Sequence, residues 1–140
     1  MVDLHKVETL LGIDCGLRRT GVCIGNTLTK TTSPLDTIHH KSSQDFLDQV
    51  GPIIQSWQPR LIVVGYPIGN EMMMKYCKST ALSMEESYCI ACVLHEENLS
   101  SWEAESYLKQ QIRIAKSNKD LIDKVSAQII LQSFINEHLN

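Results

Sequence analysis

The stretch L-L-G-I-D at residues 10–14 decides the fold class of this chain. Its first four residues are all apolar, which is typical of a central strand covered on both faces and expected here over residues 7–14. A turn through Gly16 leads to a second predicted strand, residues 20–25, close enough in sequence to pair with the first as a hairpin. A third strand over residues 32–39 completes an antiparallel meander.

Beyond the meander, helical and extended hydrophobic patterns alternate. Residues 43–57 place their large apolar side chains on one helical face, and Pro59 ends that helix. A capping-box pattern at Ser100 and Glu103 opens a later helix. The elements expected after the first helix are a strand, a helix, a strand and two helices, over residues 61–65, 71–86, 89–95, 100–112 and 121–139.

This order of elements predicts an α/β fold. We expect a mixed five-stranded sheet, in which three antiparallel strands are followed by two parallel ones, with helices on both faces. A flavodoxin-like, wholly parallel sheet is the alternative, and the opening hairpin argues against it. The 140 residues suffice for one hydrophobic core, so residues 1–140 are predicted to form a single domain.

Composition is ordinary for a soluble globular protein, with 43% hydrophobic and 21% charged residues. No apolar run reaches the roughly 18–20 residues that a membrane span needs. The first residues mix acids and bases without the apolar core of a signal peptide. Five cysteines, an odd count spread over apolar runs, are typical of reduced, buried thiols. These features predict a cytoplasmic protein that does not bind membranes.

Three acids stand where the predicted elements reach the carboxyl edge of the sheet. Asp14 closes the first strand, Glu97 follows the strand at 89–95, and Asp123 lies in the first turn of the last helix. Ligands normally bind at this edge of such a sheet. Converging carboxylates repel one another unless a cation neutralises them, and oxygen ligands suit Mg²⁺ or Mn²⁺. One or two such ions could activate a water for phosphodiester hydrolysis.

Each acid also has a plain structural explanation. Asp123 could serve only as a favourable acid at a helix N-terminus, Glu97 could lie in a solvated loop, and Asp14 could be a turn residue before Gly16. Taken singly, these explanations would be preferred. Asp14, however, ends an apolar strand, where an uncompensated charge is costly. The three positions together therefore favour a metal site.

The net charge of −3 means that a polyanionic partner needs a local basic surface or metal ions. Arg18 and Arg19 lie in the turn just past Asp14, well placed for a phosphate. A second group of cations leads to the last helix: Lys109, Arg113, Lys116, Lys119 and Lys124. This pattern favours nucleic-acid binding, although a solvated helix end would look similar.

Two other signals are interpreted as packing. Cys89 and Cys92 are three residues apart on the predicted strand and would face opposite sides, which favours core thiols over metal ligands. His95 adjoins the acidic pair Glu96 and Glu97 and could assist proton transfer, but packing is the preferred interpretation.

Four motifs, in order along nearly the whole chain, resemble those of the YqgF family, whose members are described as pre-16S rRNA nucleases and as RuvC-like Holliday junction resolvases. D-C-G-L-R-R-T-G-V at residues 14–22 resembles the family's D-x-G-x-K-R-x-G-V. V-G-Y-P at 64–67 resembles its G-L-P, and H-E-E-N-L-S-S-W-E-A at 95–104 resembles its D-E-R-x-S-[ST]-x-E-A. D-K-V-S-A-Q-I-I-L at 123–131 is similar to its D-x-x-A-A-x-x-I-L.

The resemblance implies a ribonuclease-H-like fold, catalysis with a divalent metal, and trimming of the 5′ end of precursor 16S rRNA. By position it makes Asp14, Glu97 and Asp123 the catalytic carboxylates. The chain departs from the family in having Glu96 in place of an aspartate and Asn98 in place of an arginine that could grip a phosphate. The loop after Pro67 is also shorter.

Three other functions are weighed against RNA processing. An ATPase of the actin and Hsp70 type has a similar first phosphate loop, but it needs two such domains. A catalytically silent RNA-binding member is suggested by Asn98, while retention of all three acids argues against it. A resolvase acting on branched DNA should be a dimer, whereas the sequence suggests a monomer or a weak homodimer, so precursor rRNA is the preferred substrate.

Overall fold

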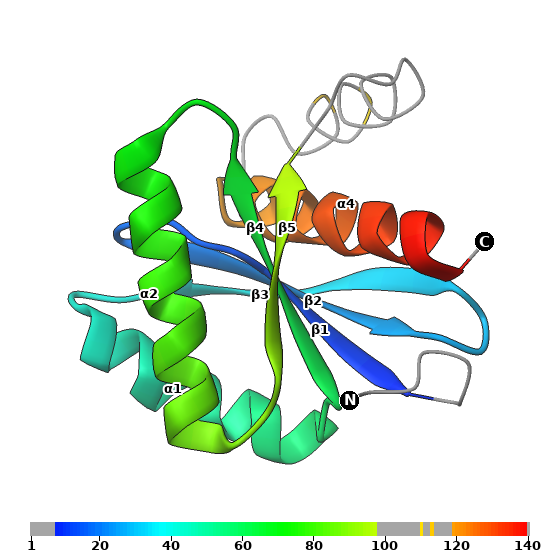
Figure 1. The fold of residues 1–140 in the computed structure, drawn as a ribbon, viewed down its shortest axis with the longest axis horizontal. Helices are drawn as coiled ribbons and strands as arrows, with labels where there is room; N and C mark the ends of the chain where they lie inside the picture. The colour runs from blue at the N-terminus through cyan, green and yellow to red at the C-terminus, as the bar shows by residue number, and fades with distance from the viewer. Residues whose placement is uncertain (1–7, 98–109, 111–112, 114–118, 140) are drawn as a thin grey trace.

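The computed structural model describes residues 8–97, 110, 113 and 119–139 (Figure 1). A meander of three strands opens the chain, and helices and strands then alternate. The elements are β1 (Thr9–Asp14), β2 (Arg19–Asn26), β3 (Thr31–His39), α1 (Ser43–Trp57), β4 (Leu61–Pro67), α2 (Glu71–Tyr88), β5 (Cys92–Glu97) and α4 (Lys119–Leu139).

The five strands form one mixed sheet in the order β3-β2-β1-β4-β5. β1 pairs with β2 and β2 with β3 in antiparallel fashion, while β4 is parallel to both β1 and β5. The predicted fold class is therefore confirmed. Because β1, β4 and β5 are parallel, their carboxyl ends lie at one edge of the sheet, and Asp14 stands there between its register partners Gly21 and Gly65.

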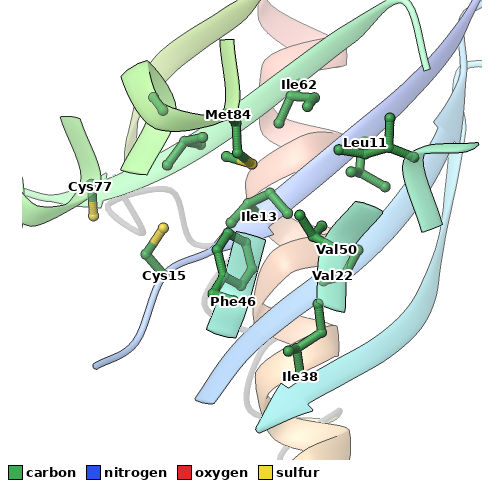
Figure 2. Packing of buried hydrophobic residues seen from close by; sticks show 13 residues of the cluster. Leu11, Ile13, Cys15, Val22, Ile38, Phe46, Val50, Ile62, Cys77 and Met84 are labelled. Atoms are coloured by element: carbon green, nitrogen blue, oxygen red, sulfur yellow. The ribbon is translucent and has the colours of Figure 1, made fainter. Parts of the chain in front are cut away.

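Each face of the sheet carries its own hydrophobic cluster, because neighbouring residues of a strand point to opposite faces. Leu11 and Ile13 of β1 belong to the cluster under α1 and α2. Leu10 belongs to the other cluster, under α4, where Ala127 is fully buried. Figure 2 shows Phe46 of α1 directed toward Ile13 in the first cluster. The prediction of helices on both faces is thus confirmed (Figure 1).

Local signals explain where the helices begin and end. Ser42 caps α1, since its side chain accepts a hydrogen bond from the Asp45 amide at 3.1 Å. Asn70 caps α2 in the same way through the Met73 amide. Gln58 ends α1 in the left-handed conformation. The predicted helix over 43–57 matches α1 at both ends.

The strand predicted over 89–95 is displaced. α2 continues to Tyr88, and Cys89 caps it in the left-handed conformation with a φ of 55°. The strand begins at Cys92, whose amide donates to the Glu85 carboxylate at 2.9 Å. Cys89 is therefore not on the strand, and the argument that it and Cys92 face opposite sides of one strand was wrong.

β5 also extends further than predicted, through Glu97, because β4 continues to Pro67 and offers it pairing partners. Glu96 and Glu97 are thus the last strand residues and not a loop. The predicted capping box and most of the helix over 100–112 lie outside the described residues. Within the part of the chain that is described, no helix has the length and apolar character needed to cross a bilayer.

Candidate active site

Asp14 ends β1 with glycines beside it on both neighbouring strands. Gly21 of antiparallel β2 and Gly65 of parallel β4 are its register partners. Residues directly opposite one another on adjacent strands lie on the same face of the sheet. Because neither partner has a side chain, α4 can pack closely against the sheet on both sides of the half-buried Asp14.

The first turns of α4 approach the sheet at this place. A Cβ atom built on Gly21 would lie 1.9 Å from the carbonyl oxygen of Asp123 and 3.0 Å from the amide nitrogen of Lys124. No other residue type could occupy position 21 without displacing the helix. Asp14 and Asp123, 109 positions apart in the numbering, therefore both adjoin the same glycine. The start of α4 therefore lies beside the strand end that carries Asp14, while the convergence of the two carboxylates stays a prediction.

Arg19, the first residue of β2, forms an ion pair with Asp123. The arginine Nε lies 3.1 Å from Oδ2 of Asp123, and the two side chains are 38% and 19% exposed. Oδ2 itself is buried. A buried carboxylate oxygen next to a second acid needs positive charge, which Arg19 supplies in this structure. Sequence reasoning placed Arg19 against a phosphate and did not foresee the ion pair.

Glu97 reaches the same edge of the sheet along β5. Its register partner is Pro67 of β4, two residues beyond Gly65. β5 is separated from β1 by β4 alone, which places the two strand axes roughly 10 Å apart. The backbone therefore brings residue 97 to the edge where Asp14 ends, as the sequence predicts.

The predicted basic residues are spread over the turn after β1 and the start of α4. Arg18 is exposed, and its carbonyl oxygen accepts the backbone N–H of His40 at 2.9 Å. Lys124 is half-buried directly after Asp123, and Arg113 is exposed. Lys119 is the first residue of α4. Lys109 and Lys116 lie outside the described residues.

His40 supports the turn that carries the two arginines, a role that sequence reasoning missed. Its Nε2 lies 2.8 Å from the Thr20 hydroxyl in a buried hydrogen bond. The Gly16 amide in turn donates to the same hydroxyl at 3.5 Å. Burial lowers the pKa of His40, so the ring is neutral at pH 7. No sequence pattern reveals this contact, because its partners are 20 residues apart.

Two buried thiols, those of Cys15 and Cys23, lie near Asp14. The pKa of Cys15 is well above its usual value because of its contact with the Cys77 thiol and its burial, and the Asp14 charge adds to this. Burial likewise raises the pKa of Cys23, again with a contribution from Asp14. The raised pKa values favour the neutral thiol over the thiolate, which is the nucleophilic and metal-binding form. The chemistry of the site therefore belongs to its oxygen donors, which suit a hard cation such as Mg²⁺.

Comparison with known proteins assigns the chain to a family. The model of the family described as "RuvX: Holliday junction resolvase" matches residues 8–137. The chain belongs to the RuvX family.

Its curated relatives are similar over almost their whole length. A protein of Thiobacillus denitrificans named "Putative pre-16S rRNA nuclease" is 34% identical over 143 residues, covering 99% of each chain. A protein of the same name from Methylobacillus flagellatus is 35% identical over 131 residues, covering 91% of this chain and 90% of the relative. The resemblance to the YqgF and RuvX nucleases predicted from the sequence motifs is thus confirmed.

Solved structures extend the comparison to the fold. T. thermophilus RuvC in complex with a Holliday junction substrate superposes with a TM-score of 0.63 at 9% identity, covering 94% of this chain and 96% of RuvC. The large terminase nuclease of phage G20c with bound magnesium gives a TM-score of 0.53 at 8% identity, covering 91% of this chain and 82% of that one. At such low identity these matches establish a RuvC-like, ribonuclease-H-like fold for this RuvX-family chain.

Proposed function

We propose that this chain is a metal-dependent nuclease that hydrolyses phosphodiester bonds in precursor 16S rRNA, with Asp14, Glu97 and Asp123 as its catalytic, metal-binding carboxylates. The observation that carries the proposal is the packing of Asp123 against Gly21, the register partner of Asp14. The backbone of Asp123 thus lies beside the glycine that pairs with Asp14, at the edge of the sheet where ligands normally bind. The cost of bringing like charges together is consistent with a site built for a cation.

The donor set fits Mg²⁺ or Mn²⁺. Carboxylate oxygens are hard ligands, and the two nearby thiols are neutral. One or two such ions, when bound, supply an activated water and stabilise the leaving oxygen of the phosphodiester. Arg19 would keep the Asp123 carboxylate oriented through its Nε, while its remaining N–H donors are available to a substrate phosphate.

The substrate would follow the basic residues on either side of the acids. Arg18 is exposed one residue before Arg19, and Lys124 directly follows Asp123. The remaining members of the proposed nucleic-acid surface are Lys109, Arg113, Lys116 and Lys119. Contacts of this kind act on the phosphate backbone and hold either RNA or DNA. The proposal places the protein in the cytoplasm, where ribosomal RNA is processed, as a monomer or weak homodimer.

The preference for RNA rests on the relatives, which carry the name pre-16S rRNA nuclease. The family description and the structure of RuvC with its junction favour a second candidate, the resolution of Holliday junctions. To resolve a Holliday junction, a nuclease needs two active sites on a symmetric dimer, placed to cut opposite strands. A monomeric protein that cleaves precursor RNA and leaves junctions intact would separate the two functions.

The test is an incubation of the purified protein with labelled precursor 16S rRNA and a labelled four-way DNA junction, side by side, with Mn²⁺ or Mg²⁺. We expect cleavage of the RNA by the wild type, no cleavage after chelation of the metal, and a loss of at least about 100-fold in Asp14→Asn. Asp48→Asn is the matched control, since Asp48 is an exposed acid on α1, on the opposite face of the sheet.

Three results would contradict the proposal. Equal cleavage by Asp14→Asn and the wild type would exclude the carboxylate site. Cleavage of the junction alone would replace RNA by branched DNA as the substrate. RNA binding without cleavage under any metal would identify a catalytically silent member of the family. Depletion in cells gives an independent readout, because 5′-extended 16S rRNA should then accumulate.

A further inference from the structure

A second group of possible metal ligands lies between β5 and the last turn of α4, away from the carboxylates. It consists of His95, Glu137 and His138, which we call the β5–α4 cluster. One ligand atom from each residue lies within 4.8 Å of the others. It is the one group of three or more His, Cys, Asp or Glu side chains with this spacing among the residues whose side chains are described. Nothing in the proposed nuclease chemistry uses it.

The cluster is distinct from the carboxylate site. Asp123 and Glu137 are 14 residues apart on α4, which corresponds to about 21 Å along a helix axis. His95 lies on β5 opposite Gly65, and Asp14 lies on the other side of Gly65. Near its start α4 thus places Asp123 beside Gly21 of β2, whereas its last turns contact His95 of the edge strand β5 through Ser133 and Glu137.

His95 is the buried member and is already held in place. It is 7% exposed, and its Nε2 lies 3.1 Å from the Ser133 hydroxyl and 3.7 Å from the Glu137 carboxylate. The ring of Phe134 contacts it edge-on, with centroids 5.7 Å apart. Burial and the Phe134 contact restrict the His95 ring, so it loses little side-chain entropy when Nε2 exchanges Ser133 for an ion.

Glu137 and His138 are exposed and come from adjacent positions in the last turn of α4. His138 packs on the face of Phe134, with ring centroids 4.4 Å apart, and its ring lies 6.5 Å from that of His95. Phe134 therefore contacts both imidazoles, that of His95 on β5 and that of His138 on α4. In a tetrahedral site with bonds of about 2.0–2.1 Å, ligand atoms stand roughly 3.3 Å apart. We expect rotation of the two exposed side chains to close the remaining gap.

We propose that His95, Glu137 and His138 form a Zn²⁺ site, with a water as the fourth ligand. Two imidazoles and one carboxylate form a donor set that zinc prefers, whereas Mg²⁺ prefers oxygen ligands alone. The ion links the edge strand β5 to the end of α4, across 42 positions of sequence. It also restrains the strand that leads to residue 97. The site does not rest on the proposed nuclease function.

The experiment titrates metal-stripped wild-type protein with Zn²⁺ in the presence of excess Mg²⁺, by equilibrium dialysis and by thermal unfolding. We expect one equivalent of Zn²⁺ to bind and to raise the melting temperature, because an ion that binds only the folded state stabilises it. His138→Ala and Glu137→Gln change exposed residues and should fold normally. Each should weaken Zn²⁺ binding by about tenfold or more. Loss of a residue that only orients a ligand already lowers metal affinity by about 10–100-fold, and these residues would be ligands themselves.

Three further variants locate the ion. His39→Ala is the matched control, because His39 is an exposed histidine on the opposite edge strand, β3. Asp14→Asn tests the carboxylate site, and Cys89→Ala tests the exposed thiol. All three should bind Zn²⁺ as the wild type does. Co²⁺ in place of Zn²⁺ should give a four-coordinate visible spectrum without a thiolate charge-transfer band.

Several outcomes would overturn the zinc site. These are unchanged Zn²⁺ binding by His138→Ala, loss of binding in Asp14→Asn or Cys89→Ala, or no Zn²⁺ binding by the wild type. The last result would leave His95 and Glu137 as neighbours that hold no ion. The two proposals can fail separately. If the protein does not cleave RNA but binds Zn²⁺ as expected, the nuclease proposal is refuted and the zinc site is supported.

Discussion

Arg19 and Asp123 form an ion pair between the first residue of β2 and the start of α4, with Nε 3.1 Å from the buried Oδ2. The pair joins the first hairpin to the last helix and brings a positive charge to the candidate metal site. A substitution of Arg19 therefore changes the charge at the candidate metal site while the acidic residues are kept.

Replacing Arg19 by glutamine should lower the free energy of unfolding by about 1–2 kcal/mol in the absence of metal. The partly buried Asp123 carboxylate would lose its cation, and the partial exposure of both side chains keeps this cost below that of a fully buried pair. Denaturant unfolding measures the change. Arg60→Gln is the control. Arg60 pairs with Glu8, but its side chain is 70% exposed, so its loss should lower the free energy of unfolding by less than about 0.5 kcal/mol. A smaller effect for Arg19 than for Arg60 would contradict this account.

Replacing Gly21 by alanine should destabilise the protein by about 3 kcal/mol and abolish nuclease activity. The new methyl group would overlap the Asp123 carbonyl oxygen, so the start of α4 must move away from β2. Thermal unfolding and the RNA cleavage assay together measure both effects. Ser33→Ala, at an exposed position of β3, serves as the control and should leave both unchanged. Full activity in Gly21→Ala would show that the position of Asp123 is not critical.

Mg²⁺ at millimolar concentration should raise the melting temperature of the wild type by a few degrees. A ligand that binds only the folded state at ten times its Kd contributes about 1.4 kcal/mol. The effect should disappear in Asp14→Asn and persist in His138→Ala, because the two proposed metal sites are separate. An identical Mg²⁺ response in Asp14→Asn would argue against metal binding by this acid.

Stability should fall as the pH is lowered from 7 to 5, partly because of His40. Burial lowers the pKa of His40 in the folded state, so the unfolded chain takes up a proton more readily. The stabilising contribution is complete above the ordinary histidine pKa of about 6.5 and declines as the pH falls below it. His40→Gln should flatten the profile of unfolding free energy against pH in this range. A profile as steep as that of the wild type would assign the effect to other groups.

Much of the fold could be predicted because it depends on neighbours in the sequence. The apolar run ending at Asp14 indicates a central strand, and the helical spacing of residues 43–57 gives α1 at both ends. The displaced β5 shows the limit of this reasoning. Apolar residues 89–91 look extended, but a left-handed cap at Cys89 ends α2 there, and pairing with β4 carries the strand to Glu97. Turn geometry and strand pairing decide such bounds more than local composition does.

The sequence by itself determined the order of the elements, the mixed sheet, the family, and Asp14, Glu97 and Asp123 as candidate ligands. Tertiary structure alone decided that Arg19 binds Asp123, that Gly21 admits the helix, that His40 supports the hairpin turn, and that His95 meets the end of α4. Periodicity and capping act within a few residues and leave a pattern in the sequence. Contacts between groups 20 to 104 positions apart depend on strand register and on the placement of α4, which emerge only when the whole sheet is assembled.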